Sequence, residues 1–256
     1  MTSESQWLVS EGGWKLHTRV HVPSTGRGRM PAVLIVPGLG APGTVLEGFS
    51  EPIHVAELVE LGVVVMTLDL SGRGKSWGVE VFGGPEHHGD VRVALGHLAS
   101  RLDVDAARIG VISLSLGCTA VAGALAEGAP PTTFWIDWEG PCDREIITSG
   151  GKMMDPAMGH SLNDDAFWHP REAVRHVGRI GVPYLRYQSA RDHAQPGEFR
   201  HAQRMIRAAS EGSLPWFQLN DHARGLVPEE PTWKPGGYRH ARNWLVEQVR
   251  LLHGMA

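Results

Sequence analysis

The sequence is short of cysteine, of long apolar runs and of net charge, and each shortage excludes a class of protein. Its two cysteines, Cys118 and Cys142, fit neither the spacing of a metal site nor a disulfide framework. No apolar run approaches the roughly 20 residues that a membrane-spanning helix requires. The formal net charge of −4 leaves no basic footprint for nucleic acid. We therefore expect two reduced thiols, no membrane and no nucleic-acid partner.

Residues 1–15 also lack the basic region followed by an apolar segment that marks a secretory signal. A cytoplasmic protein is the resulting expectation. The chain does have 42 % hydrophobic and 20 % charged residues over a length of 256, the composition of a soluble globular protein. That length is sufficient for one large domain with its own apolar core.

Eight segments have the composition of β-strands. They are residues 6–10, 14–22, 31–38, 63–70, 108–115, 132–138, 182–189 and 213–220. The first two flank Gly12 and Gly13, a pattern that predicts a hairpin. The third, fourth and fifth are continuous apolar runs, typical of parallel strands covered on both faces.

Helical patterns lie between these strands from residue 31 onward. They are residues 51–62, 87–102, 118–128, 197–209 and 237–254. This alternation requires crossover connections and predicts an α/β fold with an eight-stranded, mostly parallel sheet flanked by helices. Residues 139–180, after the sixth strand, form a longer segment than a simple crossover, which predicts a small cap over the sheet. The alternative is an irregular surface loop. We expect a single domain over residues 1–256 with this cap inserted.

Ser115 stands where the fifth strand meets a helix. The segment Ser113-Leu-Ser115-Leu-Gly117 has the form small-x-Ser-x-small. A sharp strand–turn–helix bend that presents a nucleophilic serine at the edge of a sheet needs such small neighbours. Ser113 occupies a place where glycine is more usual and makes the turn more crowded. An ordinary turn serine that caps the helix is the alternative, so the partners of Ser115 decide.

Two further residues fit the roles of those partners. A serine is a weak nucleophile and needs a base that is oriented by a third group. Asp192 follows the seventh strand and His222 follows the eighth. Because parallel strands end at one edge of a sheet, Ser115, Asp192 and His222 should converge there as a catalytic triad. Asp143, after the sixth strand, is the reserve candidate for the acid.

With these pieces in place, the chain resembles the α/β-hydrolase superfamily over nearly its full length. Within it, the chain is similar to serine esterases of the dienelactone-hydrolase and prolyl-oligopeptidase-like branch. The matching segments are VLIVPGLG, LDLSGRGKS, GVISLSLGC, RDHAQP and NDHARG. The resemblance implies an oxyanion hole made by the backbone N–H groups of Leu39 and Leu116. The dienelactone branch itself uses cysteine as nucleophile, whereas this elbow carries serine, so we do not carry over its chemistry.

Other signals are weaker. Residues 71–76, SGRGKS, look like the end of a phosphate-binding loop, but Asp69 stands where that motif needs glycine. Trp138, Met153 and Trp168 are candidates to line a substrate pocket, and core packing is their alternative role. No metal and no other cofactor is expected.

The sequence thus predicts a serine hydrolase that cleaves a carboxylic ester or amide of a small molecule through an acyl-enzyme, a carboxylesterase of class EC 3.1.1. An acyltransferase, a carbon–carbon hydrolase or a lyase with the same triad, or a small peptidase, remain alternatives. An intact triad weighs against a protein that only binds a ligand. Whether the chain forms a homodimer is left open.

Overall fold

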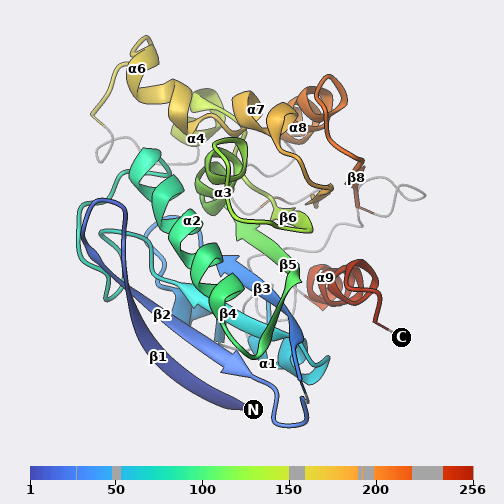
Figure 1. Cartoon of the computed structure of the whole chain (residues 1–256). Coiled ribbons are helices and arrows are strands. Elements are labelled where there is room, and N and C mark those ends of the chain that lie inside the picture. Colours follow the sequence, from blue (N-terminus) through green and yellow to red (C-terminus); the bar gives the residue numbers. More distant parts are fainter. Residues whose placement is uncertain are drawn as a thin grey trace.

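The structure of the chain, a computed structural model, describes residues 1–26, 28–47, 53–149, 159–189, 192, 199–220 and 239–255. Its frame is one eight-stranded sheet in the order β1-β2-β4-β3-β5-β6-β7-β8 (Figure 1). The strands are β1 (Thr2–Val9), β2 (Lys15–Val22), β3 (Met30–Val36), β4 (Val64–Leu68), β5 (Val104–Leu114), β6 (Phe134–Trp138), β7 (Tyr184–Tyr187) and β8 (Phe217–Leu219). The β1–β2 and β2–β4 pairs are antiparallel and the other neighbouring pairs are parallel. This confirms the predicted sheet.

Helices fill the connections. They are α1 (Val55–Glu60), α2 (Pro85–Ser100), α3 (Gly117–Ala126), α4 (Arg144–Ser149), α6 (Asp165–Trp168), α7 (Ala173–His176), α8 (Arg200–Ser210) and α9 (Arg239–Leu252), with the 3₁₀ helices η1 (Gly43–Glu47), η2 (His169–Arg171) and η3 (Val177–Arg179). Helix α2 begins with Pro85, whose fixed φ and missing N–H suit the first turn of a helix. None of the helices that the structure describes combines the length and the apolar character needed to cross a bilayer.

The central strands separate two apolar cores. Neighbouring residues of a strand point to opposite faces of the sheet, so Leu34 of β3 packs with Leu95 of α2 in one core. Ile35 packs with Leu58 of α1 and Leu245 of α9 in the other. This is why the strand reads as a continuous apolar run rather than an alternating one.

The insertion between β6 and β7, where a cap was predicted over residues 139–180, contains only short helices in its described part. These are α4, α6 and α7 with η2 and η3, and they gather beside α8 at the top of Figure 1. Helix α7 packs against both α3 and α8. The insertion is therefore anchored on the helix that follows Ser115.

The strands differ from their predicted bounds by one to four residues at an end, and β5 and β8 show why. Strand β5 begins at Val104 rather than at residue 108, because Val104 pairs with Met30 across a register shift. The residues between positions 104 and 108, Asp105 and two alanines, have low strand propensity and concealed this extension. Strand β8 covers only Phe217–Leu219 of the predicted 213–220. Pro215 lies in the missing part, and proline cannot donate a hydrogen bond to a sheet.

Candidate active site

Ser115 lies in the tight turn between β5 and α3. Its φ is +48°, a left-handed conformation that costs energy in any residue other than glycine. The N–H of Ser115 donates to the carbonyl oxygen of Trp138 at 3.0 Å, which extends the β5–β6 pairing into the turn. Gly117 makes the bend feasible, because a Cβ there would lie 2.6 Å from the carbonyl oxygen of Val36. The strained serine is therefore held from both sides.

The loop after β3 touches this serine directly. A Cβ added at Gly38 would lie 2.9 Å from the Cβ of Ser115, closer than such atoms approach in folded proteins. Only glycine allows the backbone to come so near the side chain of Ser115. Leu39, the predicted oxyanion donor, is the next residue of this loop, and Leu116 follows Ser115.

Backbone strain gathers at this edge of the sheet. Among the residues that the structure describes, four that are not glycine have left-handed φ: Phe82 (+49°), Ser115 (+48°), Glu139 (+48°) and Asn220 (+50°). The last three directly follow β5, β6 and β8. Strained residues of this kind cluster at functional sites, where the surrounding structure enforces them. The sequence had pointed to only one of the four.

Asp192 is buried behind the end of β7. Its side chain is 1 % exposed, and its Oδ2 accepts a hydrogen bond from Gln188 Nε2 at 2.8 Å. The Nε2 of His201 in α8 lies 3.2 Å from the same oxygen. Asp192 thus sits at a fixed position among polar side chains of β7 and α8.

A buried chain of polar groups leads to Asp192 from the core. Asp137 Oδ2 accepts from Arg186 Nη1 at 2.5 Å and from the hydroxyl of Tyr184 at 2.9 Å. Arg186 in turn donates through Nη2 to Gln188 Oε1 at 2.7 Å. Because Gln188 is held in this way, its amide nitrogen is directed at Asp192. The Asp137–Arg186 pair therefore acts as the anchor of the candidate acid.

Asp143, the reserve candidate, has other partners. Its Oδ1 accepts from the N–H of Ile146 at 3.2 Å, so it caps the first turn of α4. Its Oδ2 forms an ion pair with Arg204 of α8. The carboxylate therefore links α4 to α8.

Glu139 is a carboxylate that the sequence analysis did not consider. It follows β6 directly, is 1 % exposed, and its Oε1 accepts from the N–H of Ser189 at 3.0 Å and from its hydroxyl at 2.6 Å. It lies beside the turn, because the preceding residue, Trp138, accepts from the N–H of Ser115. A carboxylate directly after a parallel strand was the signal that could have found it.

Two predicted residues, His222 and Met153, lie outside the described residues. The other two pocket candidates are buried. Trp138 is 3 % exposed and packs with the core that faces α1 and α9. Trp168 is fully buried in the insertion, where its indole N–H donates to the carbonyl oxygen of Ser161 at 2.9 Å.

Trp168 belongs to a group of six apolar side chains around the elbow, which we call the apolar cluster. Its members are Leu39, Phe82, Leu116, Ile147, Phe167 and Trp168. Leu39, Phe82 and Phe167 are only partly buried, as is Ser115 itself. Both residues with predicted oxyanion N–H groups therefore direct their side chains into one apolar surface near the serine.

Arg171 fastens this surface to the rest of the domain. Its Nε donates to the carbonyl oxygen of Val81 at 3.0 Å and its Nη1 to that of Phe167 at 2.6 Å. The guanidinium also lies 3.8 Å from the centre of the Phe167 ring. The insertion is thereby tied to the strained segment at Phe82.

Neither cysteine competes with Ser115 as a nucleophile. Both are free and buried. Burial, reinforced by the negative charge of Asp137, raises the pKa of the Cys118 thiol well above its usual value. Burial likewise raises the pKa of Cys142. Both thiols stay protonated, and a protonated thiol is a poor nucleophile.

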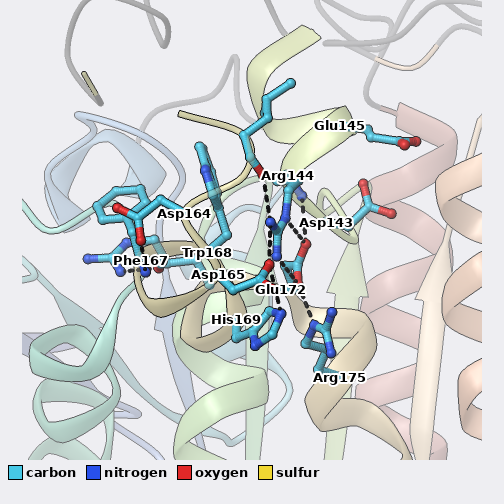
Figure 2. A network of polar contacts seen from close by, with 12 residues as sticks. Asp143, Arg144, Glu145, Asp164, Asp165, Phe167, Trp168, His169, Glu172 and Arg175 are labelled. Atoms are coloured by element: carbon cyan, nitrogen blue, oxygen red, sulfur yellow. Dashed lines mark hydrogen bonds and ion pairs between the residues drawn. The ribbon is translucent and has the colours of Figure 1, made fainter. Parts of the chain in front are cut away.

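A separate charged groove on the insertion is internally neutralised (Figure 2). Arg144 donates to Glu172 Oε1 and to Asp165 Oδ1, each at 2.7 Å, and Arg175 also pairs with Glu172. Burial alone would raise the pKa of Glu172, but the hydrogen bonds from the two arginines outweigh it and lower this pKa to about 2. The network links α4, α6 and α7 within the insertion.

No protein-family model and no curated protein sequence matches the chain. Solved structures do resemble it. A puromycin-hydrolysing peptidase of Mycobacterium tuberculosis superposes with a TM-score of 0.71 at 16 % identity over 99 % of this chain, which spans only 40 % of the peptidase. An esterase of Pyrococcus furiosus has a TM-score of 0.71 at 16 % identity, with 98 % of this chain and 89 % of the esterase covered.

The 2,6-dihydroxy-pseudo-oxynicotine hydrolase has a TM-score of 0.70 at 16 % identity, with 99 % and 68 % of the two chains covered. At these identities the likeness concerns the path of the backbone. The sheet order, the turn at Ser115 and these superpositions agree with one another: the chain has the α/β-hydrolase fold.

Proposed function

We propose that this protein is a serine hydrolase that cleaves a carboxylic ester of a small molecule, with Ser115, Asp192 and His222 as its triad. The observation that carries the proposal is the turn at Ser115. A serine with φ +48° stands between a parallel strand and the first turn of α3, in contact with the loop after β3. A serine with no chemical role would not need such a strained position.

The mechanism that we propose is that of a serine hydrolase with this triad. His222, oriented by Asp192, takes the proton of the Ser115 hydroxyl, whose oxygen attacks the carbonyl carbon of the ester. The N–H groups of Leu39 and Leu116 stabilise the resulting oxyanion, each by about 3 kcal/mol. The alcohol leaves with the proton that His222 returns, and water then hydrolyses the acyl-enzyme by the same route. No cofactor takes part.

The apolar cluster supports an ester with an apolar acyl or alcohol group. Leu39, Phe82 and Phe167 offer partly exposed apolar area next to the serine, and burial of such area contributes about 25 cal/mol per Å² to binding. A small peptidase is the second candidate, because a peptidase is among the similar structures. The chain spans two fifths of that peptidase (40 %), so the comparison covers one part of that protein only.

The test is covalent labelling with a fluorophosphonate probe, read by intact mass. We expect one adduct on the wild-type protein and none on Ser115→Ala. Ser113→Ala, two residues earlier in the same strand, is the matched control and should keep the adduct. A wild-type protein that forms no adduct, or a Ser115→Ala protein that still forms it, would refute the proposal. Esters and aminoacyl anilides of matched acyl groups then separate an esterase from a peptidase.

A further inference from the structure

Arg73 reaches the loop that carries the proposed oxyanion donor. It lies in the turn after β4 and is 3 % exposed. Its Nη1 donates to the carbonyl oxygen of Gly38 at 2.8 Å. Two more of its N–H groups bind Glu80, Nε to Oε2 at 2.5 Å and Nη2 to Oε1 at 2.8 Å. The planar guanidinium is thus fixed by a two-point contact on one side and presents its third donor to the loop.

The carbonyl of Gly38 and the N–H of Leu39 belong to one peptide unit. This peptide is trans, and in a planar trans peptide the C=O and the N–H point in opposite directions. A group that holds the oxygen therefore also sets the direction of the N–H. A positive charge at the oxygen further polarises the peptide and makes its N–H a stronger donor.

The loop needs such a restraint. Gly38 has no side chain to pack, and Gly40 adopts φ +64°, so two glycines flank the donor and leave its backbone permissive. Within the loop, the carbonyl of Gly38 also accepts the N–H of Ala41, but at 3.4 Å. The contact with Arg73 is shorter and charge-assisted, and such hydrogen bonds are about twice as strong as neutral ones.

Glu80 connects the same restraint to the apolar cluster. Its Oε1, besides binding Arg73, accepts from the N–H of Phe82 at 2.7 Å. Burial alone would raise the pKa of Glu80, but the hydrogen bonds and charge attraction around it, chiefly from Arg73, together outweigh burial and lower this pKa, so the carboxylate stays charged. The strained Phe82 and the donor loop are therefore held by one ion pair.

We propose that Arg73 is a positioning residue that aims the N–H of Leu39 at the oxyanion, with Glu80 fixing Arg73. This inference rests on the proposed serine hydrolase activity. Arg73 itself touches the loop and not the reacting atoms. Its loss should therefore slow the chemical step while leaving substrate affinity nearly unchanged, because the oxyanion forms only in the transition state.

The test compares Arg73→Gln and Arg73→Lys with the wild-type protein. Arg101→Lys is the matched control, because Arg101 also makes a two-point contact with a carboxylate, that of Asp103, and donates to no part of the loop. For both Arg73 variants we expect kcat on an ester substrate and the rate of fluorophosphonate labelling to fall about 10- to 100-fold, with KM changed by less than about twofold. Arg73→Lys should not restore kcat or the labelling rate, since lysine keeps the positive charge but lacks the several fixed N–H donors of the guanidinium. Arg101→Lys should remain within about twofold of wild type in all three values.

A second readout does not depend on activity. The order parameter of the Leu39 backbone amide, from ¹⁵N NMR relaxation, should fall in the Arg73 variants and keep its wild-type value in Arg101→Lys. Wild-type rates in Arg73→Gln would overturn the positioning role, as would an equal loss in the Arg101 control. A wild-type protein that reacts with neither ester nor probe would instead overturn the proposed function, and the role of Arg73 with it.

Discussion

At the scale of single residues, three buried carboxylates follow the ends of β6 and β7, and their partners distinguish them. Asp143 caps α4 and pairs with Arg204. Glu139 accepts two hydrogen bonds from Ser189. Asp192 is held by Gln188, which is itself fixed by Arg186 in the core. A triad acid must keep one orientation while the histidine gains and loses a proton, and the chain of contacts to Asp192 provides that.

We therefore expect Asp192→Asn to lower kcat by about 10³- to 10⁴-fold, because the amide would hold the histidine in the wrong tautomer. Asp143→Asn and Glu139→Gln should each stay within about threefold, since neither residue belongs to the proposed triad. Steady-state kinetics on one ester substrate, with thermal unfolding to confirm the fold of each variant, gives the comparison. A larger loss in either control than in Asp192→Asn would move the acid to the end of β6.

At the scale of elements, the loop after β3 and the turn at Ser115 lie against each other, because the backbone at Gly38 approaches the side chain of Ser115. Gly38→Ala tests that contact. The new Cβ would meet the Cβ of Ser115 at 2.9 Å, so either the loop or the serine must move. A displacement of the order of 1 Å at reacting groups costs about 100-fold in rate, and we expect kcat to fall by about that factor.

Gly96→Ala is the matched control for this substitution. Gly96 lies within α2, and a Cβ there would approach Pro130 no closer than 3.7 Å, an ordinary contact. It should leave kcat unchanged and raise the free energy of unfolding by about 0.5–1 kcal/mol, because alanine is the better helix former. Chemical denaturation and ester turnover measure both quantities. Unchanged turnover in Gly38→Ala would show that the loop does not restrict the serine.

Comparison of the predicted and observed strands and helices shows which of them the sequence alone could locate. The apolar runs at β3, β4 and β5 and the spacing of the helices are local signals, and they predicted the sheet and its connections. The short helices α6 and α7 were not predicted, because a helix of four residues is too short to show a periodic apolar pattern. The small neighbours of Ser115 predicted the strained turn. The left-handed conformation of Glu139 could not be predicted from neighbouring residues, because tertiary contacts impose it.

In the candidate site, too, the residues at strand ends could be predicted from the sequence, whereas the contacts that support them could not. Chain order placed Ser115 and Asp192 at strand ends, where the structure has them. The contact of Arg73 with Gly38 joins residues 35 positions apart, so no local pattern predicts it. The chain from Asp137 through Arg186 to Asp192 likewise depends on side-chain packing. Supporting contacts of this kind become visible only once the fold has brought the residues together.

At the scale of the whole molecule, three buried histidines make stability depend on pH. His21, His87 and His253 are at most 5 % exposed. Burial is the largest cause that lowers the pKa of each of them, to about 4. Each is therefore neutral in the folded protein over a pH range in which the unfolded chain, with an ordinary histidine pKa near 6.5, binds a proton.

The sign follows from this difference in bound protons. The stabilising effect of keeping the three rings neutral is complete above about pH 6.5 and is lost as the pH falls from 6.5 toward 4, because protons then favour the unfolded chain. Asp90 and Glu47 oppose the trend, since burial raises the pKa of both carboxyls, that of Asp90 to about 6. Burial also lowers the pKa of His88, His97 and His176, however, and these rings add to the effect of the three. We expect urea unfolding to give a clearly smaller free energy of unfolding at pH 5 than at pH 7.5. His253→Leu should reduce that difference by removing one titrating ring. Equal stability of the wild-type protein at the two pH values would contradict the account of the buried histidines while leaving the proposed chemistry of Ser115 intact.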